Sequence, residues 1–301
     1  MRGTRMILEN ETQVTEAVLQ AMAAAPDERL RAVMASLVRH MHAFVREIRP
    51  SEQEFETGLQ FLNAIGQATN DSHNEAVLFS DIIGVSTLVG LLNNPIGPGQ
   101  TAAALLGPFW RLNAPQCANG DTIARSETPG MPLFVAGRVT DAQGKPVAGA
   151  HVDVWQASPV GLYEVQDPNQ DDMNLRGIFT SDADGRFWFR SVKPAGYPVP
   201  VHGPSGDLLR VQRRHPFRPS HLHFMVTAPG YKTLITQVFA DDDEQLNNDV
   251  TFSVIGSLIG KFVRHESGEA PVPDVPPPFY TLAYDLVVEP GETRIPAPPI
   301  R

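Results

Sequence analysis

The first third of the chain shows the periodicity of amphipathic helices. Between residues 12 and 92 prolines are scarce, and apolar side chains recur three and four positions apart, which places them on one face of a helix. The clearest example is the run Leu30, Val33, Met34, Leu37, Val38, Met41, Phe44 and Val45. The pattern therefore predicts helices joined by short links over this region.

Two further helices can be delimited. Ser51 followed by Glu54 has the spacing of a capping box, in which each side chain bonds the other residue's backbone N–H, so a helix is predicted to begin there. Another helix is predicted from Asn74 to Leu92. Its apolar stripe suits burial within the chain or against a partner subunit, and the sequence leaves both open. The stripe comprises Ile82, Val85, Leu88, Val89 and Leu92.

The composition changes at Asn93–Gly99, where prolines and glycines interrupt any helix. Beyond this segment, short runs of alternating polarity are separated by turn sequences such as Asp141–Pro146 and Asp182–Gly185, a pattern typical of a β-sandwich. The predicted strands are Phe134–Val139, His151–Trp155, Phe187–Phe189, His221–Val226, Leu234–Phe239 and Leu282–Val288. After Glu289 the chain is rich in proline, which predicts an extended tail over the surface.

The predicted fold class is therefore mainly β with an α-helical N-terminal region. A helical dimerisation or linker domain of residues 1–100 precedes a β-sandwich domain of residues 101–301, which carries the chemistry described below.

Composition limits which partners the protein can bind and in which cellular compartment it is expected. The 301 residues carry a formal net charge of -10, which argues against nucleic acid or an anionic membrane surface as partner, since both require clustered Lys and Arg. The single cysteine, Cys117, cannot form an internal disulfide. No apolar run approaches the roughly 20 residues that cross a bilayer. We expect a cytoplasmic protein with a small-molecule partner.

His221 and His223 are the first candidate metal ligands. They begin a predicted strand, in which side chains two positions apart share a face, while Leu222 and Phe224 take the opposite face. The two imidazoles therefore converge on one point while the strand is anchored by apolar burial. A His-x-His pair alone is weak evidence for a metal, because most such histidines are structural.

Tyr163 and Tyr197 make a metal site the stronger hypothesis. Each follows a glycine or a turn in the β region, on loops expected at the same end of the sandwich. A phenolate is a hard anionic ligand that competes at neutral pH only when a strong Lewis acid lowers its pKa from about 10. Imidazole suits iron as well as zinc. Two phenolates and two imidazoles together indicate ferric iron.

These residues resemble the intradiol ring-cleavage dioxygenases, whose non-haem Fe(III) is held by two tyrosines and two histidines in the order Tyr, Tyr, His-x-His. The resemblance extends over nearly the whole chain and includes Val147–Ala157, Asn174–Gly177 and Arg218–Phe224. It implies one Fe(III) per subunit, with Tyr163 and His221 as equatorial ligands. Tyr197 and His223 would be the axial ligands.

Within the family, the chain most resembles the hydroxyquinol 1,2-dioxygenases, through Gly161–Pro168, Tyr197–Pro200 and Gly203–Leu209. This resemblance implies that O2 opens benzene-1,2,4-triol to 3-hydroxy-cis,cis-muconate, which becomes maleylacetate. The alternatives are a catechol or chlorocatechol 1,2-dioxygenase, and a β-sandwich binding module without iron.

The resemblance also assigns roles to further residues. Arg218 would stabilise negative charge on the substrate ring, Tyr197 would leave the metal and accept a substrate proton, and Gln237 would help to orient a ligand or oxygen. A second set would line the substrate, with Asp81 facing the third hydroxyl of hydroxyquinol. This set comprises Leu78, Asp81, Leu105, Leu106, Gly107, Pro108, Phe109, Val199, Pro200, Arg218 and Thr251.

Two positions depart from the subgroup pattern. Trp110 stands where a phenylalanine is common and Thr251 where an aliphatic residue is expected, so substituted substrates are expected to be ranked differently. The resemblance further implies a homodimer through the N-terminal helices, with phospholipid bound in a tunnel at the dimer interface.

Overall fold

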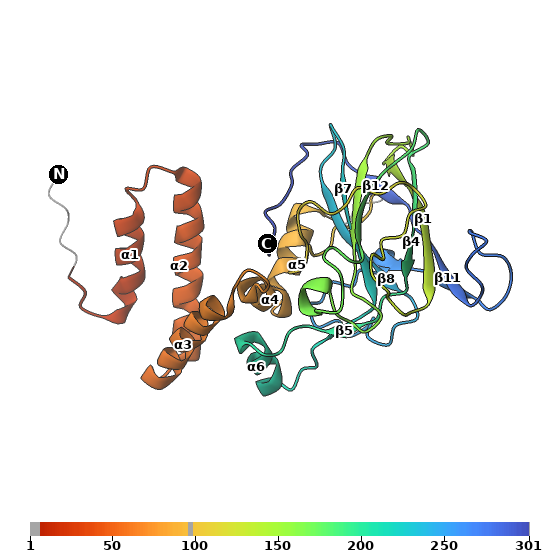
Figure 1. Cartoon of the computed structure of the whole chain (residues 1–301). Helices are drawn as coiled ribbons and strands as arrows, with labels where there is room; N and C mark the ends of the chain where they lie inside the picture. Colours follow the sequence, from red (N-terminus) through yellow and green to blue (C-terminus); the bar gives the residue numbers. More distant parts are fainter. Residues whose placement is uncertain (1–6, 96–98, 301) are drawn as a thin grey trace. The chain divides into compact units, whose positions relative to one another are not determined.

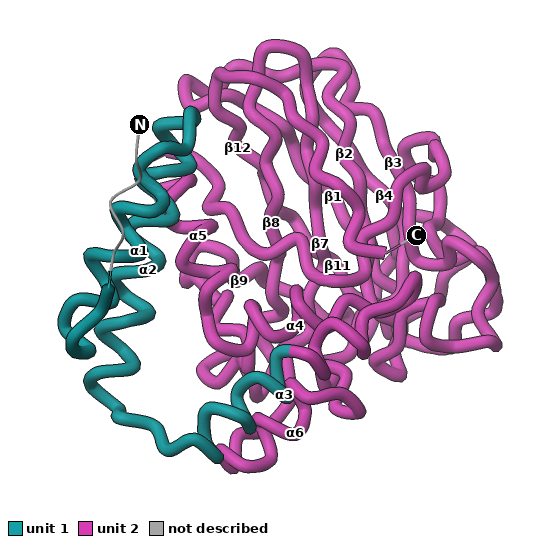
Figure 2. Tube along the Cα trace, turned by 90° about the vertical axis from the view of Figure 1, so that its left-hand side faces the viewer, with its two compact units in different colours: residues 1–62 teal, residues 63–301 magenta. Residues whose placement is uncertain are grey.

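The computed structural model describes residues 7–95 and 99–300 (Figure 1). By their contacts the residues form two compact units, of which the first ends at Leu62 and the second begins at Asn63 (Figure 2). The predicted domain boundary near residue 100 stays a prediction, and Ile96–Pro98 of the segment that suggested it lie outside the described residues.

The first unit is built from helices. It contains η1 (Glu11–Gln13), α1 (Val14–Met22), α2 (Glu28–Ile48) and the first part of α3 (Glu52–Ala68). Helices α1 and α2 lie side by side (Figure 1), and the Arg46 guanidinium donates to the Thr15 hydroxyl at 2.7 Å. No residue of α1 or α2 is buried in the single chain, so most of the predicted apolar stripe of α2 stays exposed.

The predicted capping box opens α3. Ser51 N donates to the Glu54 carboxylate at 2.8 Å, and Glu54 N donates back to Ser51 Oγ at 3.3 Å. The prediction of a single helix from Asn74 to Leu92 is wrong, because the structure has two helices there, α4 (Glu75–Ile82) and α5 (Val85–Asn93). Gly84 has φ +75° and caps α5, a left-handed conformation that a continuing helix cannot contain.

Two five-stranded sheets form the centre of the second unit, as the sequence predicts. One has the order β10-β11-β1-β12, with β4 also pairing β1, and the other has the order β3-β2-β7-β8-β9. The strands of the first sheet are β1 (Pro132–Asp141), β4 (Arg186–Val192), β10 (Phe262–His265), β11 (Phe279–Ala283) and β12 (Leu286–Val288). Those of the second are β2 (His151–Trp155), β3 (Arg176–Thr180), β7 (His221–Thr227), β8 (Leu234–Ala240) and β9 (Ile259–Gly260).

Shorter elements complete the second unit. They are η2 (Glu164–Gln166), β5 (Tyr197–Pro198), α6 (Pro204–Val211), β6 (Phe217–Arg218) and η3 (Gly256–Leu258). Strands β5 and β6 pair with each other, Tyr197 opposite Arg218. The strand predicted over Leu282–Val288 is wrong in its bounds, since Tyr284 and Asp285 lie between β11 and β12. The pattern did not predict β3, β10 or α6.

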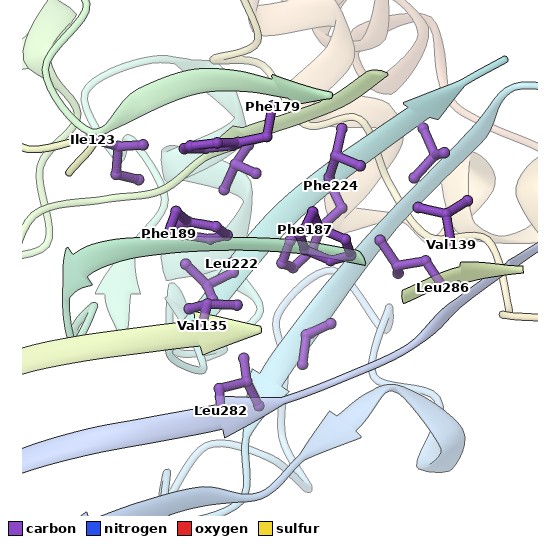
Figure 3. Close-up of a cluster of buried hydrophobic side chains, with 14 of the residues drawn as sticks. Ile123, Val135, Val139, Phe179, Phe187, Phe189, Leu222, Phe224, Leu282 and Leu286 are labelled. Carbon is purple, nitrogen blue, oxygen red and sulfur yellow. The ribbon is translucent and has the colours of Figure 1, made fainter. Parts of the chain in front are cut away.

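The main core lies between the sheets (Figure 3). Alternate residues of the longer strands contribute to it, for example Val152 and Val154 of β2 and Leu222 and Phe224 of β7, all at most 1% exposed. Each such side chain contributes roughly 1.5–3 kcal/mol by leaving water. The burial fixes the register of β7, and therefore which of its residues face away from the core.

The segment after β12 is extended and mostly exposed, as predicted, and only its end is buried. Thr293 Oγ1 donates to the carbonyl of Ala228 at 2.7 Å, and Asn74 Nδ2 donates to the carbonyl of Pro299 at 3.4 Å. Ile300 is 3% exposed and belongs to the buried cluster that contains Tyr163 and Tyr197.

Among the described residues, no single helix has the length and apolarity to span a membrane. Helices α4 and α5 meet that test only when taken as a pair, and they are bent by 78°.

Candidate metal centre

The four side chains predicted as metal ligands meet at one end of the second sheet. His221 and His223 lie on β7 with their Nε2 atoms 3.1 Å apart, and the hydroxyl oxygens of Tyr163 and Tyr197 are 3.4 Å apart. The Tyr197 ring lies 5.5 Å from that of His221, centroid to centroid. All four residues are at most 3% exposed. The structure thus brings together the four residues predicted as ligands.

The spacing of these atoms fits one ion. Donors about 2.1 Å from a metal and at right angles to each other lie about 3 Å apart, close to the separations observed here. Among the described residues, no group of three His, Cys, Asp or Glu could hold a metal. The site is distinguished instead by its two phenols, which suit a hard, highly charged cation.

A hydrogen bond sets the tautomer of His221. Its Nδ1 lies 2.7 Å from the carbonyl of Pro219, which can only accept. Nδ1 is therefore protonated, and Nε2 presents a lone pair to the centre, as metal-binding histidines do. His223 bonds the backbone of Leu105, and its Nδ1 lies 3.3 Å from Gln237 Nε2.

Burial keeps all four groups neutral in the protein alone. It lowers the pKa of His221 to about 3, helped by the positive charge of Arg218, and lowers the pKa of His223 well below its ordinary value. Burial also raises the pKa of Tyr163 and Tyr197 above the usual 10. Neutral imidazoles are ready to bind a metal, whereas these phenols require a strong Lewis acid to ionise.

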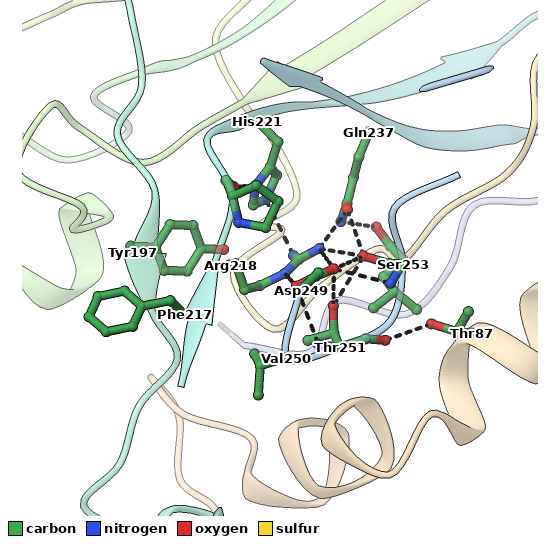
Figure 4. A network of polar contacts seen from close by, with 12 residues as sticks. Thr87, Tyr197, Phe217, Arg218, His221, Gln237, Asp249, Val250, Thr251 and Ser253 are labelled. Atoms are coloured by element: carbon green, nitrogen blue, oxygen red, sulfur yellow. Dashed lines mark hydrogen bonds and ion pairs between the residues drawn. The ribbon is translucent and has the colours of Figure 1, made fainter. Parts of the chain in front are cut away.

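Arg218 is held by a buried polar network (Figure 4). Its guanidinium donates to Asp249 at 3.2 Å, to Gln237 Oε1 at 2.8 Å and to Ser253 Oγ at 2.6 Å. Its Nη1 lies 3.3 Å from His221 Nε2, and the Tyr197 hydroxyl points toward it (Figure 4). The guanidinium is only 3% exposed, so its cation is fixed beside the four predicted ligands.

Asp249 is a functional candidate that the sequence reasoning missed. Burial opposes its charge, but Arg218 and the hydroxyls of Ser253 and Thr251 outweigh this and hold its pKa well below the usual range. The only signal was the alternation of polar residues in Asp249, Thr251 and Ser253. Thr251, predicted to line the substrate, donates its hydroxyl to Asp249 at 2.8 Å.

Gln237 joins the network to the neighbouring strand. It lies on β8 directly opposite His223. Its Oε1 accepts from Arg218, and its Nε2 donates to the carbonyl of Leu105 at 2.9 Å. Because both ends of the amide are fixed, Gln237 locks Arg218 to the backbone beside His223.

The predicted substrate wall is divided between two cavities and a buried cluster. Asp81 and Leu105–Gly107 line a cavity of about 660 Å³, whereas Phe109 and Pro200 line another of about 330 Å³. Leu78 and Val199 pack together in a separate buried cluster. Pro108, between Gly107 and Phe109, is half-buried.

Asp81 is the one carboxylate among the predicted wall residues. It is 4% exposed, and burial raises its pKa to about 6 although Ser86 bonds to it and Arg218 attracts it. A carboxylate in this setting gains from any further hydrogen-bond donor.

Two family models match the sequence. Residues 105–290 match the family described as dioxygenase, and residues 27–101 match the catechol dioxygenase N terminus. The chain belongs to the intradiol ring-cleavage dioxygenases. These two matches cover both the helical region and the strands that carry the site of this dioxygenase.

Relatives of known activity agree with this membership. A hydroxyquinol 1,2-dioxygenase of Rhizobium sp. (strain MTP-10005) is 43% identical over 86% of this chain and 88% of its own length. A 6-chlorohydroxyquinol 1,2-dioxygenase of Cupriavidus pinatubonensis is 42% identical over 93% and 98%. The solved hydroxyquinol 1,2-dioxygenase of Pseudomonas putida DLL-E4 superposes with a TM-score of 0.85, at 38% identity over 93% and 98%.

Tyr163 of the dioxygenase is enclosed by Phe109, which was predicted to line the substrate, and by Arg176, to which the sequence reasoning gave no role. Phe109 stacks on its ring at 4.5 Å between centroids, and the Arg176 guanidinium lies 5.8 Å from the ring centre. Glu164 binds Arg176 through two bonds of 2.7 and 2.8 Å. Arg176 and Trp155, which stacks on His223 at 4.7 Å, occur within the segments that carried the family resemblance.

Proposed function

We propose that the chain is an Fe(III)-dependent dioxygenase that opens hydroxyquinol with O2 to 3-hydroxy-cis,cis-muconate, the enol form of maleylacetate. The observation that carries the proposal is the buried set of two phenols and two imidazoles with Arg218 beside it. The hydroxyquinol dioxygenases at 43% and 38% identity support the choice of substrate.

Tyr163, Tyr197, His221 and His223 would hold one ferric ion per subunit. The ion would supply the charge that ionises the two phenols and the Lewis acidity that draws electron density from a bound diol. The metal is tested by colour, because tyrosinate bound to Fe(III) absorbs visible light. Iron-loaded protein should be red-brown, and a colourless one would favour a binding module without iron.

The remaining roles belong to the protein's own groups. The Tyr197 phenolate oxygen, which points toward Arg218 (Figure 4), would accept a proton from a diol hydroxyl. The Arg218 guanidinium would stabilise negative charge on the ring and orient the substrate. Gln237 and Asp249 would keep that guanidinium in place.

The function is tested by oxygen uptake with hydroxyquinol and catechol side by side. We expect faster uptake with hydroxyquinol, and a product spectrum of an opened ring. Faster cleavage of catechol would instead make the chain a catechol 1,2-dioxygenase, an activity carried by its structural neighbour from Acinetobacter radioresistens, with a TM-score of 0.83 and 28% identity.

Selectivity for the third hydroxyl should depend on Asp81. If its carboxylate accepts a hydrogen bond from that hydroxyl, Asp81→Asn should preserve iron and colour. It should lower the ratio of kcat/KM for hydroxyquinol to kcat/KM for catechol. A hydrogen bond to a charged group, worth about 1.5 to 3 kcal/mol, corresponds to roughly a ten- to hundredfold fall. Ser86→Ala is the matched control, because it removes a partner of Asp81 but keeps the carboxylate. Equal losses with both substrates in Asp81→Asn would make Asp81 structural.

The same ratio should depend on pH. The pKa of Asp81 is raised to about 6, so the carboxylate is ionised above this pH and protonated below it. A neutral carboxyl forms the weaker hydrogen bond. The ratio should therefore fall as the pH drops through about 6 in the wild type and stay flat in Asp81→Asn.

We further propose that the helical region forms a homodimer that encloses lipid. Apolar side chains on α2 and α5 are exposed in the single chain, for example Leu37 at 50%, Met41 at 54% and Leu92 at 71%, whereas Ile82 is fully buried. Such a stripe is stabilised by covering it. Sedimentation should show a dimer and an organic extract should contain phospholipid; a monomer without lipid contradicts both.

A further inference from the structure

The segment Leu105–Trp110 is one wall of the candidate metal centre. The Leu105 carbonyl bonds the amide of Gln237, opposite His223. Gly107 has φ +74°, and a Cβ at this position would lie 3.2 Å from His223 Cε1. Phe109 stacks on the ring of Tyr163. A displacement of this segment would therefore move two of the four predicted ligands, His223 and Tyr163.

This wall contains no helix or strand, so its position depends on its anchors. At its end, Trp110 Nε1 donates to Asp153 Oδ2 at 2.9 Å. Both residues are buried, with exposed fractions of 2% and 6%. The anchor is therefore a hydrogen bond shielded from water, where such a bond is strongest.

Asp153 offers a rigid point of attachment. It lies on β2, which is paired with β3 on one side and β7 on the other. Its neighbours Val152 and Val154 face the core between the sheets, so Asp153 faces the other side, as does Trp155, which stacks on His223.

A carboxylate is a costly residue at this position. Trp110 is its only hydrogen-bond donor among the described contacts, and Arg176 is engaged by Glu164. Burial consequently raises the pKa of Asp153 to about 7, against the opposing effects of Trp110 and Arg176. For packing alone, an apolar side chain would be more stable here than a carboxylate. The presence of Asp153 therefore favours a role for its carboxylate as a hydrogen-bond acceptor.

We propose that Asp153 is a positioning residue: by accepting the indole hydrogen bond of Trp110, it holds the Leu105–Trp110 wall against Tyr163 and His223. The inference rests on the proposed function, since the readouts below are those of an iron-loaded intradiol dioxygenase. It gives Trp110 a role that a phenylalanine at the same position cannot fill, because phenylalanine has no N–H to donate.

The experiment compares Asp153→Ala, Trp110→Phe and the double variant, each iron-loaded. If the hydrogen bond positions the wall, both single variants should shift the visible absorption band in the same direction. Both should lower kcat about three- to tenfold with little change in KM. The double variant should be no worse than either single one, because all three lack the same bond. Asp153→Asn, whose amide oxygen still accepts, should recover the wild-type band.

Ser181→Ala is the matched control for lost stability. Ser181 is also buried, and its hydroxyl bonds the carbonyl of Val147, away from the wall. This variant should lower the melting temperature without moving the band. An unshifted band in Asp153→Ala, or a shift equal to that in Ser181→Ala, overturns the proposal.

A second measurement separates this proposal from the function on which it rests. In metal-free protein, the unfolding free energies of the same four proteins (wild type, two single variants and the double variant) report whether Asp153 and Trp110 interact. Additive effects there overturn the positioning role. If the effects are non-additive, but the wild type loads iron and cleaves no diol, only the proposed function is contradicted.

Discussion

Tyr197→Phe should bind iron but lose nearly all ring cleavage. The substitution removes an anionic oxygen and the proton acceptor for the second hydroxyl of the diol, while Tyr163, His221 and His223 remain. Loss of a positioned general base lowers turnover by about 10²- to 10⁴-fold. Oxygen uptake, iron content and the visible spectrum are the measurements, and the band should shift because one of two phenolates is gone.

Tyr284→Phe is the matched control for Tyr197→Phe. Tyr284 also has a raised pKa, about 12, because of burial, and its hydroxyl bonds the carbonyl of Ser257 at 2.7 Å, outside the site. It should keep both colour and turnover. Near wild-type uptake in Tyr197→Phe at full iron occupancy would remove Tyr197 from the catalytic role.

Arg218→Lys should keep iron and lose at least about tenfold in turnover, roughly 1.4 kcal/mol of transition-state stabilisation. A lysine retains the charge but cannot bond Asp249, Gln237 and Ser253 at once from a single nitrogen in the same geometry. Steady-state kinetics with iron analysis checks this, and loss of iron would make Arg218 structural.

Arg218→Met should have the larger effect on folding. It leaves the Asp249 carboxylate buried without its cation, which costs about 3–5 kcal/mol of unfolding free energy for pairs of this kind. Arg214→Met is the control, since Arg214 bonds the backbone carbonyls of Ile82 and Val250 and no carboxylate. If the two variants lose equal stability, the Arg218–Asp249 ion pair contributes no more to the free energy of unfolding than the hydrogen bonds of Arg214.

Local periodicity predicted only part of the site, whereas the roles of Tyr197, Arg218 and Gln237 came from the family resemblance. The two-residue period of a strand places His221 and His223 on one face, and burial of Leu222 and Phe224 makes that orientation the only stable one. The capping box at Ser51 is equally local, because its hydrogen bonds span three residues.

Features that depend on tertiary packing could not be predicted in this way. Asp249 lies 31 positions after Arg218, in a segment without regular structure, and no spacing rule connects the two. The break at Gly84 was hidden because the apolar pattern continues on both sides of it. The division of the substrate wall into two cavities depends on how side chains from distant segments pack.

The burial of Ile300 makes the end of the described chain a reporter of the site. Its side chain shares a cluster with Tyr163 and Phe109, yet the residues leading to it contain no helix or strand. Residues 291–295 are already exposed, but a protease can cut beside Ile300 only after its side chain leaves the cluster. The rate of that cut, measured in native buffer, therefore reports how often the cluster around Tyr163 opens. It detects opened molecules even when they are too few to change a spectrum.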